Sequence, residues 1–84
     1  MTNPEEINYD GVFIGAVSKR ATERICIGIR EYAGNRFIDI RTYFINKNGE
    51  WIPTRKGVTL PMEAYPELAE SVAGIGEALG FDGE

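Results

Sequence analysis

The segment Ile25–Leu60, ICIGIREYAGNRFIDIRTYFINKNGEWIPTRKGVTL, decides the fold of this 84-residue chain. Isoleucine occupies every second position from 25 to 29, which is the two-residue period of a half-buried strand. Ala33-Gly34-Asn35 then favours a turn, because glycine and asparagine tolerate positive φ angles. Asn48-Gly49 is the strongest short hairpin signal in the chain. We therefore predict three consecutive antiparallel strands, with the longest over Arg36–Ile45 and the last over Trp51–Leu60.

The sequence on either side completes the expected fold. An apolar run at Val12–Val17 predicts a first strand near residues 12–19. After Pro61, apolar residues recur at three- and four-residue steps and predict an amphipathic helix that begins around 62–66 and stops at Gly80. The order β-β-β-β-α indicates an α+β domain, a four-stranded antiparallel sheet followed by a C-terminal helix, over residues 11–80. We expect residues 1–10 to be a flexible acidic N-terminus and residues 81–84 to be an acidic tail.

Alternation along the longest strand assigns its side chains to two faces of the sheet. Tyr43 and Phe44 must point in opposite directions, and we expect the Tyr43 ring to be packed. Pro53 cannot donate a ladder hydrogen bond, which predicts a sheet edge or a break near it. One face should carry Ile38, Ile40, Thr42 and Phe44, and the other Phe37, Asp39, Arg41, Tyr43 and Ile45.

Charge is strongly segregated along the chain. All nine basic residues lie between positions 19 and 56 together with only four acids, so this window carries 9 − 4 = +5. The flanks hold the other nine acids and no bases, hence −9. A basic sheet between acidic ends indicates a polyanionic partner, although the whole chain carries −4.

Composition argues against an enzyme. The chain has no histidine, one cysteine and no recognisable metal-ligand or phosphate-binding motif, so we expect no catalytic residues, no metal and no cofactor. Cys26 is expected to be a packing residue, and it has no partner for an intramolecular disulfide. The sequence shows no signal peptide and no membrane-spanning run, and we expect an intracellular protein.

Between Ile25 and Leu79 the sequence resembles the positive cofactor four (transcriptional coactivator) family of single-stranded DNA-binding domains. The matching pieces are REYAGNRFIDIR at Arg30–Arg41, the pair Tyr43-Phe44, the turn Asn48-Gly49-Glu50, and PTRKGVTL at Pro53–Leu60. They occur in order without a gap, and the amphipathic helix follows. The sequence shows no long Ser- and Lys-rich extension like that of the eukaryotic coactivators, so we expect it to resemble a bacterial or phage member, acting in the bacterial cytoplasm or nucleoid or in a phage-infected host.

The resemblance implies a strongly curved sheet, a homodimer, and single-stranded DNA bound in grooves between the sheets. The family's DNA-contacting positions correspond here to Tyr32, Arg41, Phe44, Arg55 and Lys56. Three usually basic positions hold Ala33, Asn35 and Ile52, so either backbone affinity is weaker or Arg36 and Lys47 compensate. Trp51 is a further candidate stacking ring. The helix residues expected at the dimer interface are Leu68, Val72, Ile75 and Leu79.

Several alternatives stay open from the sequence. The Trp51 ring is as consistent with core packing as with base stacking, and Arg41 could form a structural ion pair with Asp39. Lys19, Arg20 and Arg24 could extend the groove or only solubilise a turn. The function expected first is sequence-independent binding of single-stranded DNA in replication, recombination or transcription. The rivals are an adaptor for a polymerase or replication factor, and an RNA-binding module.

Overall fold

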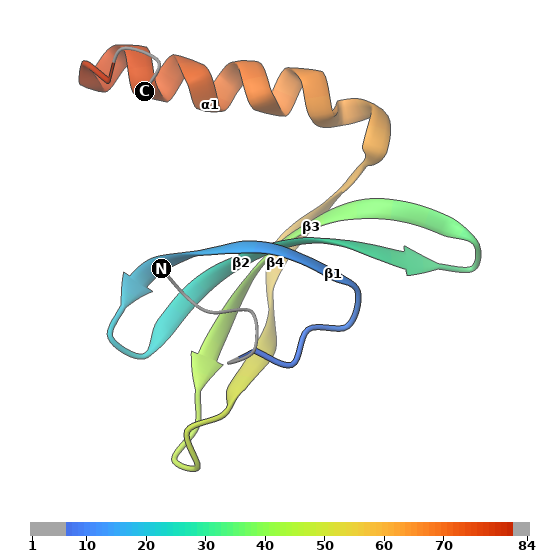
Figure 1. Ribbon diagram of the computed structural model, residues 1–84, viewed down its shortest axis with the longest axis vertical. Coiled ribbons are helices and arrows are strands. Elements are labelled where there is room, and N and C mark those ends of the chain that lie inside the picture. The colour runs from blue at the N-terminus through green and yellow to red at the C-terminus, as the bar shows by residue number, and fades with distance from the viewer. Residues whose placement is uncertain (1–6, 82–84) are drawn as a thin grey trace.

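The structure is a computed structural model, and it describes residues 7–81. The chain forms strands β1 (Val12–Arg20), β2 (Glu23–Tyr32), β3 (Asn35–Ile45) and β4 (Trp51–Pro61). A 3₁₀ turn, η2 (Met62–Ala64), leads into helix α1 (Tyr65–Leu79). Figure 1 shows a curved sheet with the helix leaving the end of β4. The predicted α+β fold, four antiparallel strands followed by a C-terminal helix, is confirmed.

The four strands form an antiparallel meander in the order β1-β2-β3-β4. Pro53 therefore lies on an edge strand, and the β3–β4 register shifts beside it, between the pairs Arg41↔Gly57 and Tyr43↔Pro53. The β2–β3 turn differs from the expectation in detail. Its positive φ angles belong to Ala33 and Gly34, whereas Asn35 already begins β3. Two consecutive positive φ angles match the right-handed twist of the flanking strands.

The sheet has two chemically different faces. The isoleucine face carries Ile25, Ile27 and Ile29 of β2, with Ile38 and Ile40 opposite them on β3. The core face carries the intervening residues. Its buried cluster consists of Ile7, Cys26, Tyr43 and Trp51. Tyr43 is thus packed, as expected from the sequence.

Residues 7–10 cover part of the core face. Ile7 is buried within the core cluster, and the Tyr9 ring stacks on Tyr43 with ring centroids 6.2 Å apart. Asp10 pairs with Arg30 at 3.2 Å. Two side chains of this segment, Ile7 and Tyr9, therefore pack against the sheet, within the stretch 1–10 that the sequence predicts to be flexible. Residues 1–6 lie outside the described part of the chain.

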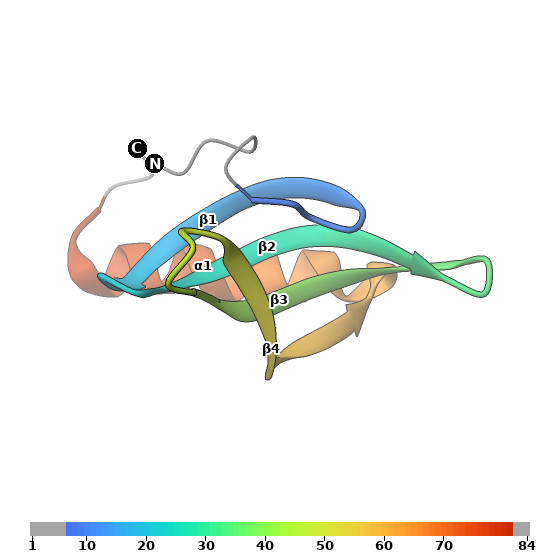
Figure 2. The same cartoon turned by 90° about the horizontal axis from the view of Figure 1, so that it is seen from below.

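Helix α1 runs beside the sheet on its isoleucine side and leaves most of that face uncovered. Pro66 occupies its first turn, and Gly80, with φ 87°, ends it in the left-handed conformation. The N–H of Phe81 then donates to the carbonyl of Gly76 at 2.8 Å, which satisfies one terminal carbonyl group. No residue of α1 is buried in the single chain. Figures 1 and 2 show the helix running beside the sheet, attached to it chiefly through η2.

Candidate nucleic-acid interface

A bulge in β4 presents the basic pair Arg55 and Lys56. Between Pro53 and Gly57 the strand holds three residues opposite the single residue Thr42. The Thr54 hydroxyl donates to the Thr42 carbonyl at 2.7 Å and accepts from the N–H of Lys56 at 3.1 Å, which fixes the shape of the bulge. Both basic side chains are exposed. Bulges often redirect side chains at sheet edges in this way.

A buried ion pair anchors the bulge from the core face. Asp39 is fully buried, and its Oδ1 accepts from Nη2 of Arg41 at 2.8 Å. Nη1 of Arg41 donates to the carbonyl of Thr54 at 3.1 Å, directly before Arg55. The hydrogen bond to Asp39 raises the pKa of Arg41 further above its high ordinary value. Arg41 therefore positions β4, as the structural alternative from the sequence anticipated.

Two aromatic side chains beside the basic residues are open to solvent. Phe44 lies near the end of β3 and is 40 % exposed, and Tyr32 lies at the β2–β3 turn and is 78 % exposed. Apolar rings of this size are usually buried, so their exposure indicates surfaces that a ligand can cover. Flat exposed rings near basic side chains can stack unpaired bases while the charges contact phosphates.

Of the two roles that the sequence left open for Trp51, the structure favours core packing over base stacking. Trp51 is only 8 % exposed and belongs to the core cluster with Cys26 and Tyr43. The guanidinium of Arg24 lies 4.3 Å from the centroid of its ring. The ring is therefore occupied by packing and by a cation–π contact, so we assign Trp51 a role in the core.

The candidate residues form two groups along β3. Tyr32 and Arg36 lie at the β2–β3 turn, and the second group lies toward the opposite end of the strand, where Phe44 faces Ile52 and the bulge carries Arg55 and Lys56. Eleven strand residues separate the ends by roughly 35 Å at about 3.3 Å per residue. One chain therefore does not gather all the candidates into one pocket. A ligand that touches both groups must run along β3 or cross between two subunits.

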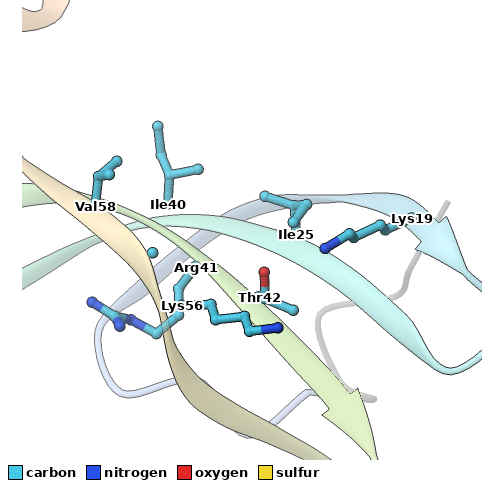
Figure 3. A pocket seen from close by; sticks show the side chains of 8 residues that line it. Lys19, Ile25, Ile40, Arg41, Thr42, Lys56 and Val58 are labelled. Carbon is cyan, nitrogen blue, oxygen red and sulfur yellow. The ribbon is translucent and has the colours of Figure 1, made fainter.

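A hollow on the isoleucine face adjoins the bulge (Figure 3). Its volume is about 310 Å³, and its aliphatic floor is formed by Ile25, Ile40 and Val58. Lys19 and Lys56 enter it from opposite sides in Figure 3. Lys19 also lies 3.5 Å from Glu23, which in turn pairs with Arg20 at 3.3 Å. The sequence left the role of Lys19 open, since only the hairpin register brings it near β4.

A second hollow, of about 250 Å³, lies between the isoleucine face and the start of the helix. Ile14, Met62, Tyr65 and Leu68 are among its lining residues, and no charged side chain lines it. Farther along α1, the predicted interface residues Val72, Ile75 and Leu79 are all more than half exposed. They extend this apolar surface along the helix.

Residues 7–81 contain no group of three or more His, Cys, Asp or Glu side chains placed to hold a metal ion. No helix in the same part of the chain has the length and apolar character needed to cross a membrane.

Comparisons with known proteins relate this chain to one family. The family described as Transcriptional Coactivator p15 (PC4) matches residues 19–71, more than half of the chain. The RNA polymerase II transcriptional coactivator SUB1 of Saccharomyces cerevisiae is 34 % identical over 71 residues, which cover 83 % of this chain. The chain spans only 22 % of that relative's length.

Solved structures show the same fold. A PC4 homologue from Burkholderia pseudomallei superposes with a TM-score of 0.71 at 33 % identity, covering 76 % of this chain and 86 % of the homologue. A bacteriophage T5 homologue of PC4, implicated in recombination-dependent DNA replication, superposes with a TM-score of 0.67 at 24 % identity. That alignment covers 86 % of this chain and 83 % of the phage protein.

Proposed function

Because this chain belongs to the transcriptional coactivator p15 (PC4) family, we propose that it binds single-stranded DNA as a homodimer with little sequence preference. The role we infer is to protect, open or anneal strands during replication, recombination or transcription. A bacterial or phage setting is supported by the similarity to the Burkholderia and T5 proteins. The proposal includes no catalytic step, in keeping with relatives that are named coactivators.

The observation that carries this proposal is the exposure of Phe44 beside the β4 bulge. The exposed ring and the cations of Arg55 and Lys56 lie toward one end of the β3–β4 pair. Among residues 7–81 neither cation takes part in an ion pair, so both are available to phosphates. Rings that stack on any base, combined with charges that follow the backbone, give affinity without base readout.

At the β2–β3 turn, Arg36 extends the proposed surface on the isoleucine face, and Tyr32 adds an exposed ring on the opposite face of the sheet. Arg36 is exposed opposite Glu31 in the ladder, and no ion pair of Arg36 is formed within the described residues. Arg41 contributes mainly by holding the bulge. Its guanidinium has five N–H groups, of which Asp39 and Thr54 engage one on each nitrogen, so one N–H on each terminal nitrogen can still face a phosphate.

The dimer is proposed from the surface that the single chain leaves uncovered. The Cα radius of gyration is 14.0 Å, whereas a compact domain of this length would have about 12 Å. The excess reflects a helix that stands beside the sheet with no buried residue. A second copy that packs its helix against Leu68, Val72, Ile75 and Leu79 would cover this stripe and the adjoining apolar hollow.

The main test is the substitution Phe44→Ala. Loss of the stacking ring should weaken binding of a fluorescent oligo-dT strand by about 1–3 kcal/mol, measured by anisotropy. Phe81→Ala is the matched control, because Phe81 is an equally apolar exposed ring beyond the end of the helix. Unchanged affinity in a folded Phe44→Ala variant would refute the proposed stacking site.

The basic pair is tested through salt dependence. Arg55→Ala with Lys56→Ala should weaken binding to all sequences alike and reduce the slope of log K against log [salt] by about 0.7 for each phosphate that the pair no longer neutralises. An unchanged slope would remove the pair from the interface. Competition with RNA and duplex DNA of equal length then separates the proposed ligand from its nearest alternatives.

A further inference from the structure

We propose that the hollow beside the bulge seats one nucleotide of the bound strand, with Lys19 as a phosphate contact and with Ile25, Ile40 and Val58 as the surface under the base. This inference rests on the proposed function and extends it to a specific subsite. It adds one cation and an aliphatic floor to a surface otherwise composed of aromatic and basic side chains.

The chemistry of the hollow matches a ligand that is both flat and anionic. Its floor is aliphatic, whereas the ammonium groups of Lys19 and Lys56 enter from opposite sides (Figure 3). A base with its ring face over Val58 and Ile40 would bury aliphatic surface that is now in contact with water, while its polar edges stay free to contact solvent. A volume of about 310 Å³ lies at the lower end of the range for ligand sites, roughly 300–1,000 Å³, and suits a single nucleotide.

Gly57 allows β4 to lie close to β3 at the edge of the hollow. A Cβ at this position would lie 2.6 Å from the carbonyl oxygen of Ile40 and 2.8 Å from Cα of Arg41. Only glycine lets β4 pass this close to β3 as it leaves the bulge. The close approach places Lys56 and Val58, the two neighbours of Gly57, against the hollow.

Lys19 can move to a phosphate without leaving its acidic partner unpaired. Glu23 lies 3.5 Å from Lys19 and also 3.3 Å from Arg20. Surface ion pairs of this kind contribute little to stability, so exchanging Glu23 for a phosphate costs little. Arg20 remains with Glu23 after the exchange.

Charge also separates this hollow from the apolar one at the helix. A symmetry-related copy packed onto the Lys19–Lys56 hollow would bring like charges together in a partly dehydrated contact, which is unfavourable. The hollow lined by Ile14, Met62, Tyr65 and Leu68 contains no such charge. We therefore assign the charged hollow to nucleic acid and the apolar hollow to the second copy.

The test uses two strands with equal numbers of phosphates, oligo-dT and an abasic strand of the same length, and three variants of the full chain. Lys19→Gln should weaken both strands alike and lower the log–log salt slope by about 0.7. Val58→Thr replaces one methyl group of the floor with a hydroxyl, so the base loses about one methyl group of apolar contact; this should weaken oligo-dT about fourfold while leaving the abasic strand and the slope unchanged. Arg20→Gln is the control, because it removes the same charge from the same hairpin outside the hollow, and its slope should equal that of the wild type.

The outcomes are decisive in either direction. Equal effects of Lys19→Gln and Arg20→Gln would show general electrostatics and overturn the subsite, as would equal weakening of both strands by Val58→Thr. If light scattering gave Val58→Thr a different oligomeric mass from the wild type, the hollow would be assigned to the second copy instead. If Val58→Thr does not fold, Ile25→Val trims the same floor and repeats the comparison. Wild-type binding that depends on Phe44 but not on Lys19 or Val58 would defeat this inference alone, whereas absence of wild-type binding would defeat the proposed function as well.

Discussion

The ring of Tyr9 lies directly against the backbone of Gly28, so that a Cβ at position 28 would overlap the ring. The same ring stacks on Tyr43 and meets Phe13 edge-on, with ring centroids 5.7 Å apart. Its hydroxyl donates to Oδ2 of Asp39 at 3.4 Å. Because Gly28 has no side chain, the Tyr9 ring can pack against its backbone, and residues 7–10 can cover part of the core face of the sheet.

Gly28→Ala should therefore displace Tyr9 and destabilise the fold. Forcing an extra methyl group into a packed contact typically costs about 1–3 kcal/mol, which urea unfolding would measure. Gly15→Ala is the matched control, because no atom lies within 4 Å of a Cβ built there. Equal urea midpoints for the two variants would show that Tyr9 does not pack against Gly28 in solution.

The two aspartate–arginine pairs differ in burial, so removing the aspartate should destabilise the fold by different amounts. Asp39 is completely buried beneath Arg41, so Asp39→Ala leaves a cation without its partner and should cost about 3–5 kcal/mol. The side chain of Asp10 is 92 % exposed in its pair with Arg30, and Asp10→Ala should cost less than about 1 kcal/mol. Thermal unfolding of both variants checks the difference, and comparable losses would contradict the burial of Asp39.

Local chemistry explains why so much of the fold is predictable. Alternating isoleucines, the Asn48-Gly49 turn and the helical spacing after Pro61 act over a few residues, so each element is expected within a few residues of its observed bounds. Alternation also separates Tyr43 from Phe44. It cannot tell which face the rest of the chain covers.

The missed features depend on contacts between distant segments. Ile7 and Tyr9 belong to a polar terminal segment that has no periodic apolar pattern, so the sequence does not predict their burial. Their positions depend on contacts with the core face of the sheet. Trp51 resembles a stacking ring because it lies beside basic residues, yet Arg24 and the core cluster occupy it. Pro53 indicates a break in β4, but the bulge that exposes Arg55 depends on hydrogen bonds made by Thr54 and Arg41, which the sequence does not reveal.

Stability should fall in alkaline solution because burial disfavours the ionised thiol of Cys26. Burial raises the pKa of this thiol from 9.0 to about 11, and burial also raises the pKa values of Tyr9 and Tyr43. A group whose pKa is raised by folding contributes stability that is complete below its unfolded pKa and is lost as pH rises through the folded pKa. The Cys26 contribution should therefore disappear between about pH 9 and 11.

Urea midpoints measured from pH 7 to 11 would follow this loss. Cys26→Ala should begin less stable, because a buried sulfur is removed, but should lose less stability across that interval. Parallel pH profiles for the variant and the wild type would show that the thiol does not resist ionisation.

The sharpest test of assembly is a charge placed on the helix stripe. Val72 is exposed in the single chain, at the centre of the apolar stripe of α1. If this stripe meets its symmetry mate, Val72→Glu buries two carboxylates near the two-fold axis, where they repel each other and lose their hydration. The variant should be monomeric or unfolded at micromolar concentration in light scattering, and its affinity for single-stranded DNA should fall with the loss of the paired grooves.

Ala73→Glu, about 100° around the helix from Val72, introduces the same charge away from the stripe and should remain dimeric. A wild-type mass equal to that of one chain would falsify the dimer, and a dimeric Val72→Glu variant would place the interface elsewhere.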